Sequence, residues 1–228
     1  MDVIKMIGHN EIVEITTPVI PTWHDGKSRL CGDFRALNNY KKADRYPIPM
    51  IAHALDELAK AKCINKMDFI KGFHQNVVKP NSMELLRIIC HMGIYKYTRM
   101  PFGIKNAPAH FQKMMDTIFC EEILEGWMLV YIDDIIIYAE TWEDHVQGIE
   151  RVLSKCKTIN LKISLKKWNF GQQELLALGH KVSGLSLAID QNKVAAVLKR
   201  PVQRASKRCN LSLGLLTIAE TTSRLLPT

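Results

Sequence analysis

Two adjacent acidic residues, Asp133 and Asp134, interrupt an apolar stretch of the sequence. The runs WMLVYI before them and IIIYA after them are typical of two short strands joined in a hairpin. Ionised carboxylates between buried strands repel each other and lose hydration, which raises their free energy unless a cation or solvent compensates. A hydrated surface turn is the alternative reading. The flanks argue against it, because they contain no Gly, Asn or Lys to mark an exposed hairpin tip.

A third acidic residue, Asp68, lies near the end of CINKMDFI (63–70), which the residue pattern predicts to be a strand. Three carboxylates at one sheet edge suit Mg²⁺, because this ion prefers oxygen ligands and completes its shell with substrate phosphates. Two such ions can activate an attacking hydroxyl and stabilise a departing pyrophosphate. We therefore predict that Asp68, Asp133 and Asp134 hold two Mg²⁺ ions, with Mn²⁺ as an alternative ion.

The order of the surrounding elements predicts how these acids are brought together. Helix and strand periods alternate along residues 63–165 in the order β, α, β, β, α, β, which is that of a split βαβ, ferredoxin-like sheet with helices on one face. Asn106 followed by Ala-Pro predicts a helix start, and Thr141 begins a capping box. A further helix is predicted within 47–62 and a last strand at 161–165. The predicted fold class is α+β.

The composition and the charge distribution set bounds on the protein's class. The 228 residues are 47% hydrophobic and 24% charged, as in a globular protein. The net charge is +8, but residues 1–145 carry 17 basic and 19 acidic side chains, whereas residues 146–228 carry 14 and 4. The basic last third either contacts a polyanion or forms a solvated face. Six scattered cysteines without a C-x-x-C pair signal neither a metal framework nor a disulfide scaffold.

The sequence also carries expectations about the protein's location. Its N-terminal residues lack the apolar core of a signal peptide, and no stretch reaches the roughly 18 apolar residues of a membrane span. We therefore expect an intracellular protein, in the cytoplasm or the nucleus, with no membrane partner. Buried, inert thiols in a reducing compartment fit this expectation.

Seven blocks of the sequence occur in the order in which one protein family has them. The blocks are RLCGDFRALN (29–38), RYPIP (45–49), MDFIKGFHQ (67–75), MPFGIKNAPAHFQ (100–112), YIDD (131–134), TWEDH (141–145) and ALGHKVS (177–183). The chain resembles the reverse transcriptase domain of gypsy-type long-terminal-repeat retrotransposons over residues 17–201. The resemblance implies a right-hand polymerase of fingers and palm, with the ferredoxin-like unit as the palm. It also implies cytoplasmic virus-like particles, and a polyprotein whose thumb, RNase H and integrase segments are missing from this chain.

The resemblance implies roles for individual residues. The family's catalytic aspartates fall on Asp68, Asp133 and Asp134, so the family and the physical reading agree. Phe73 falls where the family keeps an aromatic ring beneath the incoming sugar, which would select deoxynucleotides; an ordinary core phenylalanine is the alternative. The other implied nucleotide-binding residues are Arg29, Phe102, Gly103, Gln112, Lys166 and Lys167, and the implied primer-binding residues are Tyr131, Leu178, Gly179 and His180.

Several of these side chains also have simpler readings. The planar guanidinium of Arg29 suits phosphate oxygens, but a surface arginine is the alternative. Lys166 and Lys167 match a lysine near the leaving pyrophosphate, and a solvated pair is equally consistent. His180 taken alone is more often a structural histidine. Gly103 would allow close approach of the backbone to the nucleotide.

The chain departs from the family's pattern at its two ends. Its start lacks part of the fingers sequence, and after Pro201 it reads VQRASKRCNLSLGLL where the family has a segment like KEMQSFLGF. Because codons for Ala205–Glu220 can be chosen so that another frame encodes the family's segment, we predict a frameshift after Pro201. Residues 1–62 are then partial fingers, 63–201 the palm with a fingers segment inserted around 76–100, and 202–228 a poorly ordered, out-of-frame tail.

The predicted function is that of an RNA-directed DNA polymerase. It would add deoxynucleotides to a primer 3′-hydroxyl on an RNA or DNA template by two-metal-ion phosphoryl transfer. Its partners would be the primed nucleic acid and deoxynucleoside triphosphates. An inactive remnant that at most binds nucleic acid through its basic third is the alternative. A nucleotide cyclase is disfavoured, because the chain has no Gly-Gly-Asp-Glu-Phe-like block.

Overall fold

The computed structural model describes the backbone of residues 2–8, 11–24, 26–49, 58, 61–172, 174–177, 180–183 and 186–189. The side chains of these residues are described as well, except at 24, 27–30, 174–177, 180–183 and 186–189. The chain forms two compact units that interleave in sequence. Unit 1 comprises Met1–Ile48, Met67–Ile135 and Glu150–Trp168, and unit 2 comprises Pro49–Lys66, Ile136–Ile149 and Asn169–Thr228. The helix predicted within 47–62 lies almost entirely outside the described residues, although Leu58 is helical and buried, and the predicted tail at 202–228 lies outside them completely.

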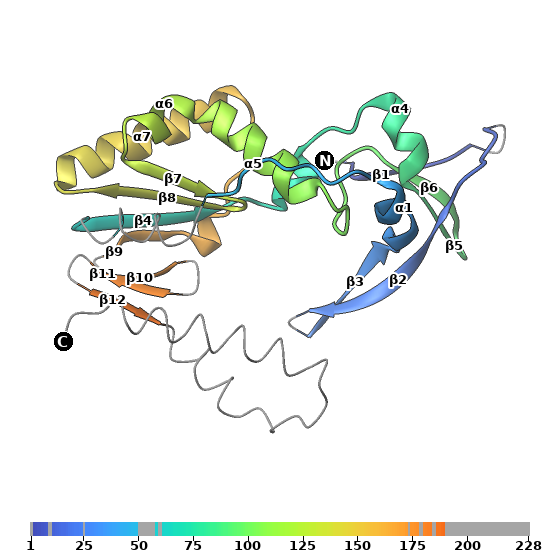
Figure 1. Ribbon diagram of the computed structural model, residues 1–228, viewed down its shortest axis with the longest axis horizontal. Helices are drawn as coiled ribbons and strands as arrows, with labels where there is room; N and C mark the ends of the chain where they lie inside the picture. Colours follow the sequence, from blue (N-terminus) through green and yellow to red (C-terminus); the bar gives the residue numbers. More distant parts are fainter. Residues whose placement is uncertain are drawn as a thin grey trace, which may run out of the picture. The chain divides into compact units, whose positions relative to one another are not determined.

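A five-stranded sheet belongs to unit 1 (Figure 1). Its strand order is β1-β6-β5-β2-β3. The strands are β1 (Ile4–Met6), β2 (Thr17–His24), β3 (Lys27–Gly32), β5 (Arg87–Cys90) and β6 (Gly93–Tyr97). β2 and β3 form an antiparallel hairpin, while β2 pairs in parallel with β5. N-terminal strands and strands from the middle of the chain therefore build one sheet.

A four-stranded sheet carries the acidic residues. Its strands are β4 (Cys63–Asp68), β7 (Met128–Tyr131), β8 (Asp134–Ala139) and β9 (Asn169–Gln172), in the order β7-β8-β4-β9. Helix α5 (Ala107–Ile118) lies in sequence between β4 and β7, and α7 (Trp142–Thr158) between β8 and β9. This is the topology of the predicted split βαβ unit, with β9 as its fourth strand, and the predicted hairpin is confirmed as β7 and β8. The boundary between the two units passes through β4, β8 and α7.

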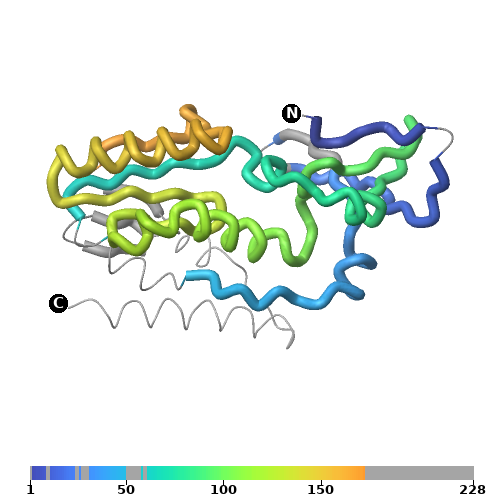
Figure 2. The backbone as a smooth tube through the Cα atoms, turned by 90° about the horizontal axis from the view of Figure 1, so that it is seen from above, coloured from blue at the N-terminus to red at the C-terminus, as the bar shows by residue number. Residues whose placement is uncertain are grey.

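Two helices of unit 1 pack beside β7. Figure 1 draws α5 and α6 (Cys120–Leu124) on the same side of β7, and Figure 2 shows the α5–α6 segment in green. The apolar side of α5 is buried at Phe111 and Met115, as its helical spacing predicts. Asn106 precedes the first residue of α5, so the predicted helix start is confirmed. The predicted apolar stripe thus becomes the surface that packs on the strands.

The start of α7 is stabilised by the capping box that the sequence predicts. The Thr141 hydroxyl accepts a hydrogen bond of 3.2 Å from the Asp144 backbone N–H, and it donates one of 2.6 Å to the Asp144 carboxylate. The first bond satisfies one of the backbone donors that have no partner within the helix. The acidic first turn and the basic last turn, with Lys155 and Lys157, also match the helix dipole.

The prediction of a strand at 161–165 is wrong. This segment makes a single β-bridge, between Ile163 and Phe69, and Leu165 then begins a short 3₁₀ helix, η2 (Leu165–Lys167). The reason is that β4 ends at Asp68 and the chain turns into α3 (Gly72–Gln75), which leaves no straight partner for a longer ladder. The edge position beside β4 is taken by β9 instead.

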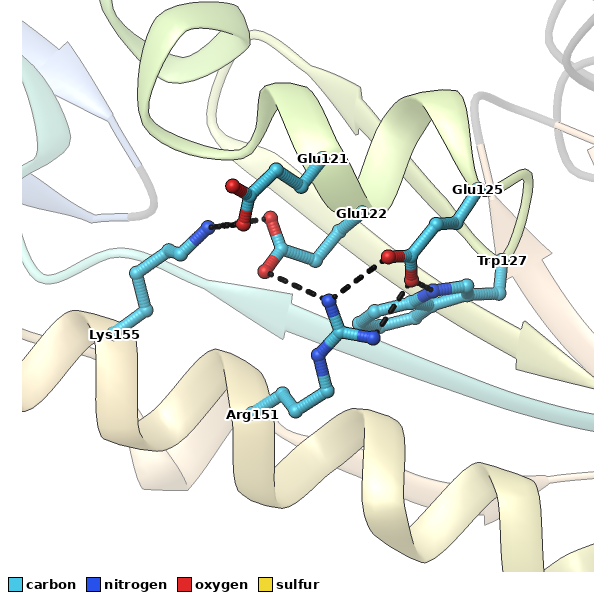
Figure 3. Close-up of polar contacts among 6 residues, drawn as sticks. All are labelled: Glu121, Glu122, Glu125, Trp127, Arg151 and Lys155. Atoms are coloured by element: carbon cyan, nitrogen blue, oxygen red, sulfur yellow. Dashed lines mark hydrogen bonds and ion pairs between the residues drawn. The ribbon is translucent and has the colours of Figure 1, made fainter.

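Ion pairs fasten α6 to the C-terminal half of α7 (Figure 3). Glu122 is buried, and its carboxylate accepts a 2.8 Å hydrogen bond from Lys155. Arg151 binds Glu125 at 2.7 Å, and its guanidinium lies 5.0 Å from the centre of the Trp127 ring. Because the Glu122 carboxylate is buried, loss of its partner Lys155 would leave an uncompensated charge, whereas the exposed pair of Arg151 and Glu125 is screened by solvent.

The remaining described elements are short. In unit 2, β10 (Glu174–Ala177), β11 (His180–Ser183) and β12 (Ser186–Ile189) form an antiparallel three-stranded sheet. In unit 1, α1 (Arg35–Tyr40) follows β3, and α4 (Pro80–Met83) and the 3₁₀ helix η1 (Glu84–Leu86) precede β5. Among the helices that the structure describes, none is long and apolar enough to cross a membrane.

Candidate active site

The three predicted aspartates meet at one end of the four-stranded sheet, within unit 1. Asp68 is the last residue of β4, Asp134 is the first residue of β8, and Asp133 lies in the turn before it. Because β4 and β8 are neighbours in the sheet, residues 65 positions apart in the sequence are brought together. The carboxylates of Asp68 and Asp134 are close enough to act electrostatically on Asp133.

The Asp133 carboxylate is perturbed by its surroundings. Burial raises its pKa to about 6, and the negative charges of Asp68 and Asp134 add to this effect. Its Oδ1 atom is buried and has no hydrogen-bond partner among the described residues. An ionised oxygen in such a place is unstable without a cation, since neither water nor a donor compensates its charge.

Lys167 supplies one positive charge at this site. Its ammonium group donates a 2.7 Å hydrogen bond to Oδ2 of Asp68. This hydrogen bond is the main cause of the raised pKa of Lys167, and the negative charges of all three aspartates add to it. The lysine side chain is 66% exposed and that of Asp68 is 21% exposed. Lys166, its neighbour on η2, is also exposed. Of the two predicted lysines, Lys167 is therefore the one that the structure brings to the carboxylates.

The donor set fits a hard divalent cation. All its atoms are carboxylate oxygens, and one of them is buried without a partner among the described residues. In the described part of the chain, no three His, Cys, Asp or Glu side chains are already arranged as a set of metal ligands. The Asp68 carboxylate, which would be one such ligand, is engaged by Lys167 in this structure. Side-chain rotation at Asp68 would thus be part of metal binding.

The turn that carries Asp133 has a strained backbone. Ile132 has φ +53°, in the left-handed region that β-branched residues rarely occupy. Its N–H donates a 2.7 Å hydrogen bond to Oε1 of Gln112, and Nε2 of Gln112 donates one of 2.9 Å to the carbonyl of Val130. Gln112 is completely buried on α5. One amide therefore holds both sides of the turn.

A glycine makes room for the buried carboxylate. At Gly72, the first residue of α3, an added Cβ would lie 2.6 Å from Oδ1 of Asp133 and 3.2 Å from the ring of Phe111. No side chain other than hydrogen fits there unless the carboxylate moves. The short segment from Asp68 to Gly72 thus provides the Asp68 carboxylate and also the space for the Asp133 carboxylate.

Aromatic rings surround Phe73 next to this glycine. Its ring meets those of Phe102 and Phe111 edge-on, with centroids 5.5 Å apart in both cases. The His74 ring lies 4.8 Å from that of Phe102, and its Nδ1 is 3.0 Å from the Met100 carbonyl. Burial lowers the pKa of His74. Phe73 is half-buried and packed on two sides, so its ring is held in a fixed position beside the acids.

The other predicted site residues are placed less completely. Tyr131 ends β7 and is half-buried, and Gly103 is exposed with φ +88°. Arg29 lies in β3 opposite Thr22, and His180 begins β11, but their side chains are not described. Leu178 and Gly179 lie outside the described residues. The nucleotide and primer contacts of these residues stay predictions.

Two supporting residues escaped the sequence reasoning. Gly72 could have been noticed, because an isolated glycine between a strand and a short helix often marks a close approach of backbone to another group. Gln75 had no such signal. Its amide donates to the Ile70 and Lys162 carbonyls at 3.0 and 2.8 Å and accepts from the Lys162 N–H at 2.7 Å. These bonds hold the segment before Lys167 against the end of β4.

Comparison with known proteins agrees with this arrangement. The sequence profile of the family described as "Reverse transcriptase (RNA-dependent DNA polymerase)" matches residues 21–182, which include all three aspartates. The chain belongs to the reverse transcriptase family. The resemblance to this family in the sequence is thereby confirmed, and so is the α+β polymerase fold of fingers and palm.

Curated relatives of this reverse transcriptase domain are polyproteins of retrotransposons. The chain is 35% identical over 221 residues to the "Retrovirus-related Pol polyprotein from transposon 297" of Drosophila melanogaster, covering 92% of this chain and 21% of the relative. It is 32% identical over 186 residues to the "Transposon Tf2-3 polyprotein" of Schizosaccharomyces pombe, covering 81% of this chain and 14% of the relative. The chain thus spans about a fifth or less of the length of these relatives.

Solved reverse transcriptases share its fold. A foamy viral protease-reverse transcriptase in complex with double-stranded DNA superposes with a TM-score of 0.84 at 23% identity, covering 95% of this chain and 37% of that one. The foamy viral enzyme in complex with an RNA/DNA hybrid gives a TM-score of 0.77 at 22% identity, covering 96% of this chain and 29% of that one. At these identities the likeness shows the fold.

Proposed function

We propose that the chain is the fingers-and-palm part of an RNA-directed DNA polymerase, which adds deoxynucleotides to a primer 3′-hydroxyl on an RNA or DNA template. The observation that carries the proposal is the buried, unpartnered oxygen of Asp133 beside two further carboxylates, at the end of a palm-type sheet. Structural acids are normally paired or hydrated. Acids that repel one another lower the stability of the fold unless their charge is compensated, and a bound cation is the simplest compensation.

The proposed metal ligands are Asp68, Asp133 and Asp134. Mg²⁺ bound there would activate the primer hydroxyl and neutralise charge on the departing pyrophosphate. Asp133 lies in a turn fixed by Gln112, so its oxygens are held in place before substrate binds. Asp68 is paired with Lys167 and would exchange this partner for the ion. The freed ammonium group would then lie near the phosphates, where the family has a lysine.

The proposed nucleotide site lies beside the acids. The Phe73 ring is held edge-on by Phe102 and Phe111, and it has no polar atom to pair with a 2′-hydroxyl. It would therefore disfavour a ribonucleotide by occupying the space of that hydroxyl. Arg29 is proposed to bind the triphosphate and Gly103 to allow close approach of the nucleotide.

Primer extension by the purified chain tests the proposal. With an RNA or a DNA template and Mg²⁺, we expect extension that is lost in Asp68→Asn and in Asp133→Asn. Asp2→Asn, at an exposed acid far from these residues in sequence, is the matched control and should keep the activity. Extension that survives either catalytic substitution would refute the assignment of the acids.

A second measurement separates a metal site from a polymerase. Mg²⁺ should raise the melting temperature of the wild-type chain and not that of Asp133→Asn, because a ligand that binds the folded state stabilises it. A Mg²⁺ shift without extension would favour the alternative of an inactive remnant that retains the metal site. Absence of both the shift and extension would overturn the proposed function. This alternative matters because the chain spans a small part of its relatives.

A further inference from the structure

A chain of hydrogen bonds joins the segment RYPIP to the turn of the aspartate hairpin. The Tyr46 hydroxyl donates a 2.7 Å bond to Oδ2 of Asp116 on α5. Oδ1 of Asp116 accepts a 2.9 Å bond from Nε2 of Gln112, one helical turn earlier. Gln112 in turn binds the Val130 carbonyl and the Ile132 N–H. All these residues belong to unit 1.

Each polar atom in this chain has a defined role. Both hydrogens of the Gln112 Nε2 group are donated, one to Asp116 and one to Val130, and Oε1 accepts from Ile132. The orientation of the amide is therefore determined, because a flipped amide would face the Ile132 N–H with another donor. Both carboxylate oxygens of Asp116 also accept hydrogen bonds, one from Gln112 and one from the Tyr46 hydroxyl. The hydrogen bond to Asp116 raises the pKa of Tyr46 to about 12. The phenol thus stays a donor at neutral pH.

The chain of hydrogen bonds that starts at Tyr46 ends at the strained turn around Ile132. Ile132 adopts φ +53°, which is unfavourable for a β-branched side chain and must be held by surrounding contacts. Gln112 is 0% exposed and bonds the residues on both sides of Tyr131. The next residue, Asp133, has the unpartnered carboxylate oxygen. A shift of the amide would move the backbone that aims this carboxylate.

We propose that Tyr46, Asp116 and Gln112 form a positioning network that holds the backbone of the Ile132–Asp133 turn in its strained conformation, and so sets the place of the Asp133 carboxylate. In this proposal Gln112 positions the Asp133 carboxylate by holding the hairpin backbone, whereas the sequence resemblance implied that Gln112 contacts the nucleotide. Tyr46 acts on the turn from outside the four-stranded sheet. The proposal deepens the proposed polymerase function, because it assigns residues that orient its metal ligand.

Amide hydrogen exchange tests the network without any need for activity. In Gln112→Met, which has a similar volume and no amide, the exchange of the Ile132 N–H should accelerate by about tenfold, since one net hydrogen bond is lost. Tyr46→Phe removes a single hydroxyl and should accelerate the same amide by a few-fold. Tyr40→Phe is the matched control at an exposed tyrosine and should change nothing. Unchanged Ile132 exchange in Tyr46→Phe would overturn the network.

A double-mutant cycle separates coupling from general loosening of the fold. If Tyr46 acts through Gln112, then Tyr46→Phe should have no further effect on Ile132 exchange in the Gln112→Met background. Additive effects would mean that the two residues act independently, which would overturn the proposal. Exchange of amides in β2 and β3 should be the same in all variants, because none of the four hydrogen bonds of the network involves a residue of those strands.

The activity readout tests the functional part separately. Tyr46→Phe should lower the turnover number of primer extension by a few-fold and leave the KM for deoxynucleotide unchanged, as expected for a residue that positions a catalytic group. A raised KM with unchanged turnover would assign Gln112 and Tyr46 to nucleotide binding instead. If wild-type protein shows no extension but Ile132 exchange responds as expected, the network stands and the proposed function fails.

Discussion

Replacing Asp133 with Asn should make the metal-free protein more stable while removing its catalytic function. The pKa of Asp133 is raised from 3.8 to about 6 because the folded state buries the carboxylate beside Asp68 and Asp134. One pKa unit corresponds to about 1.4 kcal/mol, and solvent screening reduces the effect because the carboxylate is only partly buried, so ionising this group opposes folding by about 1–2 kcal/mol above pH 6. Asn has nearly the same shape and no charge, so the variant avoids this penalty.

The sign of the pH dependence follows from the raised pKa. The folded state binds the proton more tightly than the unfolded state does, so the wild type loses stability as the pH rises from about 4 to about 6. Urea unfolding in EDTA, followed by circular dichroism, measures the difference between the two proteins. Asp133→Asn should be more stable by about 1–2 kcal/mol at pH 8, and the difference should shrink towards zero near pH 4.

Three observations would bear on this reasoning. Asp2→Asn removes an exposed carboxylate and should leave the urea midpoint unchanged at both pH values. Added Mg²⁺ should narrow the gap at pH 8, because it stabilises the wild type alone. If Asp133→Asn is no more stable than the wild type at pH 8, or if its advantage is the same at pH 4, then the carboxylate is not strained by burial and charge repulsion.

Further predictions concern packing, a buried ring and a buried ion pair. Gly72→Ala places a methyl group 2.6 Å from the Asp133 carboxylate oxygen, so it should reduce primer extension by about 100-fold through misplacement of that group. His145→Leu should raise the free energy of unfolding by about 1 kcal/mol at pH 7, because both ring nitrogens are buried without partners among the described residues. Burial lowers the pKa of His145, so the stability of the wild type relative to His145→Leu should fall as the pH drops below the ordinary value of 6.5, as urea unfolding of both proteins between about pH 5 and 8 would show. Lys155→Met should destabilise the protein by roughly 1–2 kcal/mol in the same assay, because the buried Glu122 carboxylate loses its 2.8 Å partner and keeps a longer ion pair to Arg151, at 3.7 Å.

Each of these predictions has a matched control. Gly8→Ala introduces the same methyl group into open space and should keep full activity. His110→Leu removes an exposed ring from α5, and Lys157→Met removes an exposed charge from α7; both should change the free energy of unfolding by less than about 0.5 kcal/mol. Equal effects of a test variant and its control would contradict the role assigned to the buried group.

The hairpin and the palm topology could be predicted because their signals are local. The apolar runs on both sides of Asp133 and Asp134 have the composition of strands, and both acids interrupt them at the turn. Thr141 marks a helix start through its side-chain hydrogen bond, and the proline that follows Asn106 marks another because its fixed φ suits the first turn of a helix. Once these elements are in order, few topologies remain, and the split βαβ unit is one of them.

The predicted strand at 161–165 shows where local reasoning failed. The residues LKISL alternate as a strand should, and Ile163 does form one bridge with Phe69. A strand also needs a straight neighbour, and β4 ends at Asp68, where the chain turns towards Gly72. Whether a residue pattern becomes a strand thus depended on a segment almost a hundred residues earlier.

The sequence by itself determined which acids are present, in what order they follow the strands, and to which family the chain belongs, because these depend on residue types and on neighbours along the chain. Only the tertiary structure decided that one carboxylate oxygen of Asp133 is buried against Gly72, that Asp68 pairs with Lys167, and that Gln112 supports the turn. These features come from contacts between segments far apart in sequence. Burial and charge repulsion, and hence the raised pKa of Asp133, exist only once those segments have packed together.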